Sequence, residues 1–314
     1  MKSLTDFAFN EEYDRVRRLG DRLAEIESLI DWEAFRPIVG AMYDNKSERG
    51  GRPHIDEVVM VKLLVLQQWH GLSDPELEKQ VADRISFRKF LGFPDVIPDY
   101  TTVWYFRERL ASTGRDRAIW TELQRQLDSL GLKVRKGVVQ DATFITADPG
   151  HAKAGTSRGS DAKTRRSTDG TWTKKGSKSY FGYKLHSKVD TDLGLIRDLK
   201  TTTAAVHDSQ VDLSNEGEVV YRDRGYQGTE PKGYSATMKR GARDHPLDIL
   251  DRIRNRRISK KRAPGERHYA MINRVFHATH VLVTTVSRVN VKMIFTAIGF
   301  NLYQVCTLRR QGAV

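Results

Sequence analysis

The stretch Val138-Val139-Gln140-Asp141-Ala142-Thr143-Phe144-Ile145 decides how the rest of this chain is interpreted. It predicts a short apolar strand, because β-branched and aromatic residues favour strands that are buried on both faces. One carboxylate, Asp141, lies in the middle of the run. A buried carboxylate is costly unless it is paired or bound to a cation. We therefore expect Asp141 to have a partner elsewhere in the chain.

The charge of the chain is its strongest bulk property. The 314 residues contain 53 Lys and Arg against 40 Asp and Glu, which gives a net charge of +13. The cationic residues occur in uneven blocks, and this favours an anionic polymer, nucleic acid first, as the partner. Charge that serves only solubility is the alternative.

The sequence predicts a cytoplasmic protein. Cys306 is the only cysteine, which excludes a disulfide within the chain and fits a reducing compartment. Met1-Lys2-Ser3-Leu4 opens no long apolar run, so we expect no signal peptide. The most apolar windows, residues 58–66 and 281–303, are interrupted by charged or amide side chains. We therefore expect no membrane span.

The first 132 residues are predicted to form an all-helical domain. Apolar residues recur there at three- and four-residue spacing, while Gly, Pro and N-cap residues divide one helix from the next. The expected helices cover residues 10–43, 54–69, 73–91 and 116–130, with a further one that begins at residue 99.

The helix that begins at residue 99 carries basic and aromatic side chains. With Arg107 and Arg109 on it, this helix and the one before it resemble a DNA-binding helix pair. An ordinary helical bundle with solvated arginines explains the same pattern equally well. Trp104 and Tyr105 are expected in the core, with base stacking as the alternative.

Two basic regions follow the strand that contains Asp141. Residues 151–188 contain ten Lys and Arg against two Asp. We expect residues 150–178 to form a mobile loop whose cations order on phosphate, and a merely solvated loop is the alternative. Residues 239–274 contain twelve Lys and Arg against four acids, which favours a face that follows phosphates.

The rest of the chain predicts a mixed sheet with helices on its faces. Residues 180–189 and 193–203 are interpreted as a β-hairpin, and residues 218–223 as another strand, which ends in Asp223. In this arrangement Asp141 lies in the first, central strand. Asp223 then lies at the end of a strand that can sit beside it.

Two aspartates on adjacent strands, with a glutamate from a packed helix, make a site of oxygen ligands only. Such ligands favour Mg²⁺ or Mn²⁺ over zinc. Phosphoryl transfer requires a site of this type, because two cations about 3.5–4 Å apart activate the attacking oxygen and stabilise the leaving oxygen. Glu266 is the candidate glutamate. Asp208 is expected to cap a helix rather than to bind metal.

Short motifs surround these acids. They are Asp141-Ala142-Thr143, Asp223-Arg224-Gly225-Tyr226, and Arg262 with Glu266 four residues later. Further matching segments lie at residues 73–92, 98–107, 182–184 and 205–209. Together they resemble the DDE transposases of prokaryotic insertion sequences, specifically the insertion-sequence-five group, over nearly the whole chain.

The resemblance implies an α/β fold, in which an RNase H-like mixed sheet flanked by helices covers residues 133–314, after a helical DNA-binding and dimerisation domain over residues 1–132. It implies a DNA transposase in which Asp141, Asp223 and Glu266 hold two Mg²⁺ or Mn²⁺ ions. Water would cut the DNA at the terminal inverted repeats of the element, and the freed 3′-OH would attack target DNA. A homodimer is expected, because two ends must be joined.

Basic residues in both parts of the chain are expected to contact double-stranded DNA. They are Arg107, Arg109, Lys174, Lys175, Lys178, Lys184, Arg262, Arg267 and Arg274. The family signature around the third acid also contains a Tyr and a Lys, but Ser259 and Asn273 stand in their places. We expect reduced activity unless Arg274 points in the direction of the missing Lys, and adjacent helix positions are about 100° apart.

Two other functions fit the same sequence. One is a metal-dependent nuclease that cuts DNA without strand transfer. The other is a non-enzymatic helix-turn-helix regulator with a degenerate core.

Overall fold

The computed structural model describes residues 4–43, 54–150, 169–243, 245–282 and 284–313. The chain divides into two compact units. Unit 1 comprises residues 1–131 together with residues 294–314, and unit 2 comprises residues 132–293. Residues 294–314, which we expected in the catalytic part, therefore group with the N-terminal helices instead.

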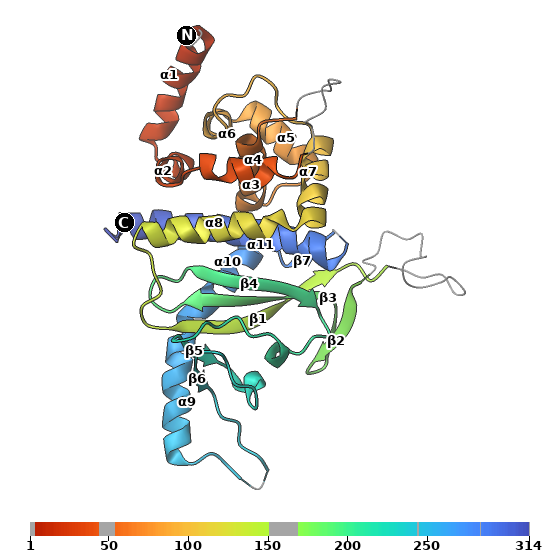
Figure 1. Cartoon of the computed structure of the whole chain (residues 1–314), viewed down its shortest axis with the longest axis vertical. Helices are drawn as coiled ribbons and strands as arrows, with labels where there is room; N and C mark the ends of the chain where they lie inside the picture. Colours follow the sequence, from red (N-terminus) through yellow and green to blue (C-terminus); the bar gives the residue numbers. More distant parts are fainter. Residues whose placement is uncertain (1–3, 44–53, 151–168, 244, 283, 314) are drawn as a thin grey trace, which may run out of the picture. The chain divides into compact units, whose positions relative to one another are not determined.

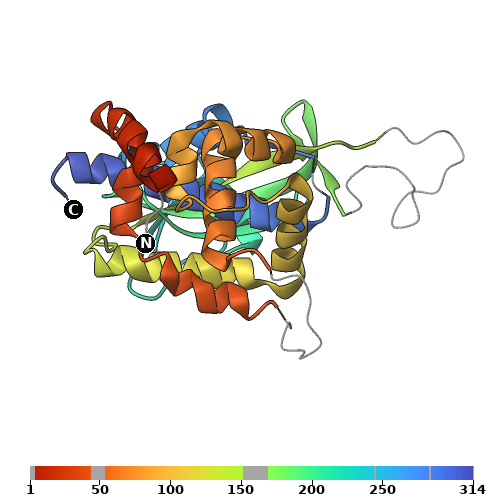
Figure 2. The same ribbon diagram turned by 90° about the horizontal axis from the view of Figure 1, so that it is seen from above.

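The described part of unit 1 consists of helices and their connections. They are α1 (Leu4–Arg18), α2 (Arg22–Leu29), η1 (Glu33–Phe35), α3 (Arg36–Gly40), α4 (Glu57–His70), α5 (Asp74–Asp83), α6 (Ile85–Phe90), α7 (Tyr100–Thr113), α8 (Arg115–Ser129) and the later part of α11 (Val286–Arg310). Every residue of α4 from Val58 to Trp69 is buried, and α3, α5 and α7 contact it. Figure 2 shows these helices from above. The apolar sequence of α4 thus makes it the centre of the bundle, and its bounds agree with the helix predicted over residues 54–69.

The predicted single helix over residues 10–43 is wrong. Gly20 follows α1 with φ +94°, a conformation that residues with a side chain rarely adopt. The Asp21 side chain then accepts the N–H of Leu23 and so begins α2. The sequence contains this signal, because Gly followed by Asp is a common stop and start between helices. The predicted helix over residues 73–91 is likewise divided at Arg84.

Unit 2 is built on a seven-stranded mixed sheet in its described residues. The strands are β1 (Val138–Ala147), β2 (Thr171–Lys175), β3 (Lys178–Asp190), β4 (Ile196–Thr203), β5 (Val219–Arg222), β6 (Tyr234–Thr237) and β7 (His280–Val281). Their order is β2-β3-β1-β5-β6, with β4 paired to β3 and β7 to β1 (Figure 1). The central β1 thus lies between the antiparallel β3–β4 hairpin and the parallel strands β5 and β6. This is the RNase H-like arrangement that the sequence predicts.

The helical segments of unit 2 follow the strands in the chain. They are η2 (Asp208–Gln210), η3 (Arg224–Tyr226), α9 (Ile249–Arg262), η4 (Ala263–Glu266), α10 (Arg267–Arg274) and the first residues of α11. α9 contacts β5 and η4, and α10 follows η4 directly. The segment that carries Glu266 therefore follows a helix that packs on β5, the strand that Asp223 directly follows.

The predicted loop over residues 150–178 differs from the structure in its second half. Residues 151–168 lie outside the described residues. Thr171–Lys175 is a strand, and its last residue pairs with Lys178 across the two-residue turn Gly176-Ser177. Gly176 has φ +62°, which suits a tight hairpin turn. A Gly-Ser pair between two short segments of strand-forming residues is a signal for a β-hairpin, and the interpretation of this region as a loop did not use it.

α11 is a described helix that is long and apolar enough to cross a membrane, judged by length and composition only. However, 78% of its most apolar window is buried inside the structure. Within unit 1 its Thr296 Oγ1 lies 3.4 Å from Gln68 Oε1, and Arg310 forms an ion pair with Glu25 at 2.6 Å. The helix therefore behaves as a core element that packs against its own chain.

Candidate active site

Asp141 lies in the middle of β1, where two neighbouring strands fix its position. On one side it is the antiparallel partner of Ser187 in β3. On the other side β1 runs parallel to β5, with Val139 opposite Tyr221. Asp141 lies two residues beyond this pair in β1, and Asp223 lies two residues beyond it, just past the end of β5 at Arg222. The parallel pairing therefore directs both carboxylates towards the same end of two neighbouring strands.

Glu266 is brought towards β1 by the close approach of η4. Gly265 lies against Val139, and a Cβ added to Gly265 would be 2.9 Å from the Val139 Cβ. The Nδ1–H of His268 donates to the Gly265 carbonyl, and Nε2 of the same ring is 2.8 Å from Ser187 Oγ. Because Ser187 is the sheet partner of the first aspartate, this chain of hydrogen bonds ties the turn that carries Glu266 to the strand pair below it.

Burial keeps His268 neutral, since it lowers the pKa of the imidazole to about 4. Burial also raises the pKa of Tyr269 well above its ordinary value. The Tyr269 hydroxyl lies 2.7 Å from Ser187 Oγ. A neutral ring with its proton on Nδ1 accepts at Nε2, so the hydrogen bonds run from Tyr269 through Ser187 and His268 to the Gly265 carbonyl. The network holds the start of α10 without adding a charge beside the carboxylates.

The three carboxylates influence one another electrostatically. Burial raises the pKa of Asp141 from 3.8 to about 6, and the charges of Asp223 and Glu266 raise it as well. The Arg262 guanidinium and the Ala142 N–H act in the opposite direction. A like charge disfavours a second ionised carboxylate, so the two other acids oppose the ionisation of Asp141.

A guanidinium already lies against Asp141. Nη2 of Arg262 is 3.2 Å from Asp141 Oδ2, and its Nη1 is 3.9 Å from the Sδ of Met238. The Nε of Arg262 is buried and has no hydrogen-bond partner in the described part of the chain. Arg262 therefore offsets the charge of Asp141 while part of its own donor capacity stays unused.

The donor set suits a hard divalent cation. Asp141 and Asp223 are half-buried and Glu266 is exposed, so all three offer carboxylate oxygens at an accessible edge. Oxygen ligands of this type are those of Mg²⁺ and Mn²⁺, and the ion pair with Arg262 indicates that the site accepts positive charge. Among the residues described, no three His, Cys, Asp or Glu side chains are already close enough to enclose a metal ion. The carboxylates must therefore turn towards one another for an ion to be shared.

Comparison with known families covers both parts of the chain. Residues 10–109 match the family described as Transposase domain (DUF772). Residues 133–302, which include all three acids, match the family described as Transposase DDE domain. The chain belongs to the DDE transposase family. It is thus an enzyme of phosphoryl transfer. No solved structure matches the chain.

Five of the predicted DNA contacts of the transposase are exposed cations. Lys174, Lys175 and Lys178 lie on the hairpin of β2 and β3, and Arg267 and Arg274 lie on α10. Because these side chains are exposed, each can contact a DNA phosphate without leaving a buried position. Asn273, which stands where the signature has Lys, is also exposed, and its Oδ1 accepts from the Thr279 hydroxyl.

Other predicted DNA contacts depart from that expectation, because partners within the protein already hold them. Lys184 is buried, and its ammonium donates to Asp208 at 2.9 Å and to the Val206 carbonyl at 2.7 Å. Asp208 is therefore an ion-pair partner, while the His207 side chain caps η2 in its place. Arg262 also forms an ion pair, with Asp141, but it stays a candidate phosphate contact because its guanidinium lies beside the candidate catalytic acid.

The two arginines predicted to read DNA from α7 are also engaged. Arg107 makes two hydrogen bonds of 2.5 Å to the carboxylate of Asp74. Arg109 stacks over the ring of Tyr43, with the guanidinium carbon 4.4 Å from the ring centroid. Both guanidinium groups are therefore bound within unit 1 in this structure.

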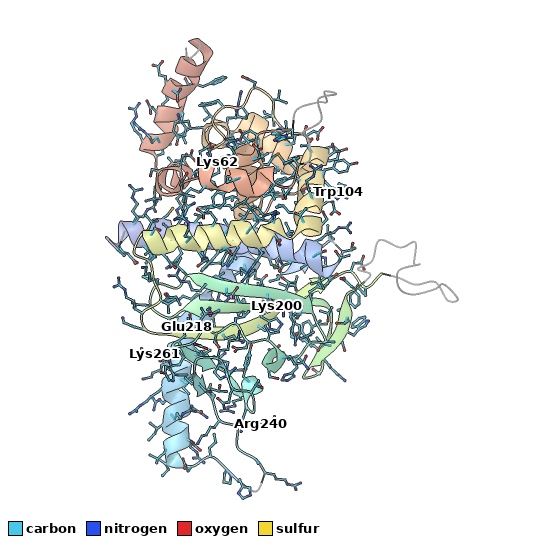
Figure 3. The ribbon with its side chains drawn as sticks, viewed as in Figure 1. Lys62, Trp104, Lys200, Glu218, Arg240 and Lys261 are labelled. Atoms are coloured by element: carbon cyan, nitrogen blue, oxygen red, sulfur yellow. The ribbon has the colours of Figure 1, made fainter. Side chains whose placement is uncertain are left out.

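Two further findings were not predicted. Arg222, next to Asp223, is fully buried and donates to Thr237 Oγ1 at 3.1 Å and to the Thr229 carbonyl at 2.6 Å. Burial lowers its pKa. The expectation that Trp104 and Tyr105 are in the core is wrong, since they are 44% and 65% exposed on α7. Trp104 is labelled in Figure 3. The helical spacing of aromatic residues alone does not say which face of a helix is covered.

Proposed function

We propose that this transposase belongs to the insertion-sequence-five group and moves its own element by binding the terminal inverted repeats, cutting them and joining the freed ends to target DNA. The observation that supports the proposal is the parallel pairing of β1 with β5, because Asp141 and Asp223 both come two residues after the pair Val139 and Tyr221. The close approach of Gly265 to Val139 supports Glu266 as the third acid.

In this proposal Asp141, Asp223 and Glu266 bind two Mg²⁺ or Mn²⁺ ions. Bound there, the ions supply activation of the attacking oxygen and stabilisation of the leaving oxygen. Arg262 has an unpartnered Nε beside these acids, and a guanidinium suits phosphate oxygens. We assign it to hold the scissile phosphodiester in line for attack.

The proposed partners are the terminal repeats, the target DNA and a second copy of the chain. The net charge of +13 and the exposed lysines of the β2–β3 hairpin support binding to DNA backbone. A homodimer follows from the need to hold two ends at once. A cytoplasmic location, at the nucleoid of a prokaryotic cell, follows from the substrate.

The proposal is tested with Asp141→Ala, because this change removes one metal ligand and leaves the DNA-binding cations in place. We expect binding of terminal-repeat DNA to persist, while cleavage of intact ends and strand transfer of pre-cut ends are both lost. Asp148→Ala, an exposed position just after β1, is the matched control and should retain both reactions.

The outcomes separate the functions. Cleavage by the wild type without transfer of a pre-cut end would replace the proposal with a nuclease. Undiminished cleavage by Asp141→Ala would remove Asp141 from catalysis. A wild type that binds DNA but neither cuts nor transfers it would favour a regulator.

A further inference from the structure

A cationic cleft lies between η3 and α9 in unit 2. It has a volume of about 430 Å³, and four of its lining residues are cations. They are Arg224, Arg252, Arg256 and Lys260. All four are exposed. Three of them belong to the basic segment 239–274 that was expected to follow phosphates, but none was named individually as a DNA contact.

The three cations of α9 form a stripe along one face of the helix. Arg252, Arg256 and Lys260 follow one another at four-residue intervals, so one cation recurs about every 6 Å over about 12 Å of helix. Asp251, an acid on the same helix, is bound to Lys239 at 2.7 Å. In the described residues, no carboxylate forms an ion pair with any of the four cleft cations. Their charge is therefore available to a ligand.

Two lining residues of the cleft, Arg224 and Met238, adjoin residues of the candidate active site. Arg224 directly follows Asp223, whose side chain accepts the Gly225 N–H and so fixes the start of η3. Met238, which also lines the cleft, contacts Arg262, and Arg262 is the ion-pair partner of Asp141. The cleft therefore borders the segments that carry Asp223 and Arg262.

We propose that this cleft binds the sugar–phosphate backbone of the DNA strand that leads away from the scissile phosphodiester. A single phosphate would meet only one or two of the cations, whereas the stripe is long enough for several consecutive phosphates of one strand, which advance about 3.4 Å each along the duplex axis. The assignment rests on the proposed function, since it takes the active site as the place where the strand is cut.

The test compares two pairs of substitutions on the same helix. Arg256→Gln with Lys260→Gln removes two cleft cations. Arg257→Gln with Lys261→Gln removes the same residue types one position along, about 100° around the helix, where neither residue lines the cleft (Lys261 is labelled in Figure 3). All four positions are exposed, so both variants should fold.

Binding of a short B-form duplex is measured in EDTA over a series of salt concentrations. We expect the slope of log affinity against log salt to fall by about 1.8 for the cleft variant, because each lost phosphate contact removes about 0.9. The control variant should change the slope by less than half as much. Equal slopes for the two variants would overturn the proposal.

A second measurement locates the strand. Ser259 lines the cleft and is exposed, whereas the only native cysteine, Cys306, is buried. Ser259→Cys should therefore react by thiol–disulfide exchange with DNA that carries a mixed-disulfide tether on a phosphate beside the cut site, which releases the small thiol of the tether. DNA whose tether lies far from the cut site should not react. Crosslinking that ignores the tether position would count against the cleft.

These results are separate from the test of the proposed function. If the wild type transfers strands but the cleft and control variants have equal salt slopes, only the assignment of the cleft is wrong. A slope difference without any strand transfer would remove the proposed function and leave a DNA-binding cleft.

Discussion

Single residues show how the site is balanced before any ion is bound. Asp141 is ionisable within a sheet, and burial together with two nearby acids disfavours its charged form. Arg262 offsets part of this at 3.2 Å. A carboxylate that is held ionised against its surroundings is typical of a functional position rather than a stabilising one.

Asp141→Asn should therefore stabilise the metal-free protein at neutral pH. The pKa of Asp141 is raised from 3.8 to about 6, so its stabilising contribution is full below pH 3.8 and is lost as the pH rises through about 6. At neutral pH the gain from Asn is at most about 3 kcal/mol, and the loss of the Arg262 partner reduces it. Urea unfolding at neutral pH and near pH 4 measures this, and the difference should vanish at the lower pH.

Metal provides the control for that experiment. Added Mn²⁺ should stabilise the wild type, because a ligand that binds only the folded state raises its stability. The variant should respond much less. A variant that is less stable than the wild type at neutral pH would show that Asp141 is a structural ion-pair partner.

At the scale of elements, three contacts with β1 assemble the site. The register with β5 positions Asp223, the pairing with β3 positions Ser187, and the approach of η4 positions Glu266. Gly265 allows that approach, because there is no room for a side chain between η4 and Val139. The geometry of Glu266 therefore depends on a residue that has no functional group.

Gly265→Ala should displace η4 from β1. Its Cβ would overlap Val139, so we expect a loss of about 1–3 kcal/mol in stability and a larger proportional loss in cleavage than in DNA binding. Gly299→Ala is the matched control, since its Cβ would meet only Trp69 backbone atoms at 3.8 Å. Unfolding and single-turnover cleavage are measured on both. Unchanged cleavage by Gly265→Ala would separate Glu266 from the reaction.

At the scale of the whole molecule, the sequence predicted what depends on local pattern. The β-branched run of β1 and the apolar run of α4 are strong signals, and the motifs around the acids led to the family. The break at Gly20 and the β2–β3 turn also have local sequence signals. They were missed because the helical repeat over residues 10–43 and the basic composition of residues 150–178 were each interpreted as one element.

The features that were not predicted depend on contacts between segments that are distant in the sequence, and no local sequence pattern contains such contacts. The link from Ser187 through His268 to Gly265 joins β3 to α10, and the ion pair of Lys184 with Asp208 joins β3 to η2. The exposure of Trp104 depends on which helices cover α7. Likewise the cations of α9 line a cleft only together with Arg224, which belongs to η3.

The central claim is that Asp141, Asp223 and Glu266, distant in the sequence, share divalent cations. The most direct measurement is the anomalous difference density of Mn²⁺ soaked into crystals of the full chain with terminal-repeat DNA. We predict two peaks about 3.5–4 Å apart, bound by carboxylate oxygens of these three residues. Peaks bound by other residues, or a Mn²⁺ site that lacks Asp141, would contradict the account.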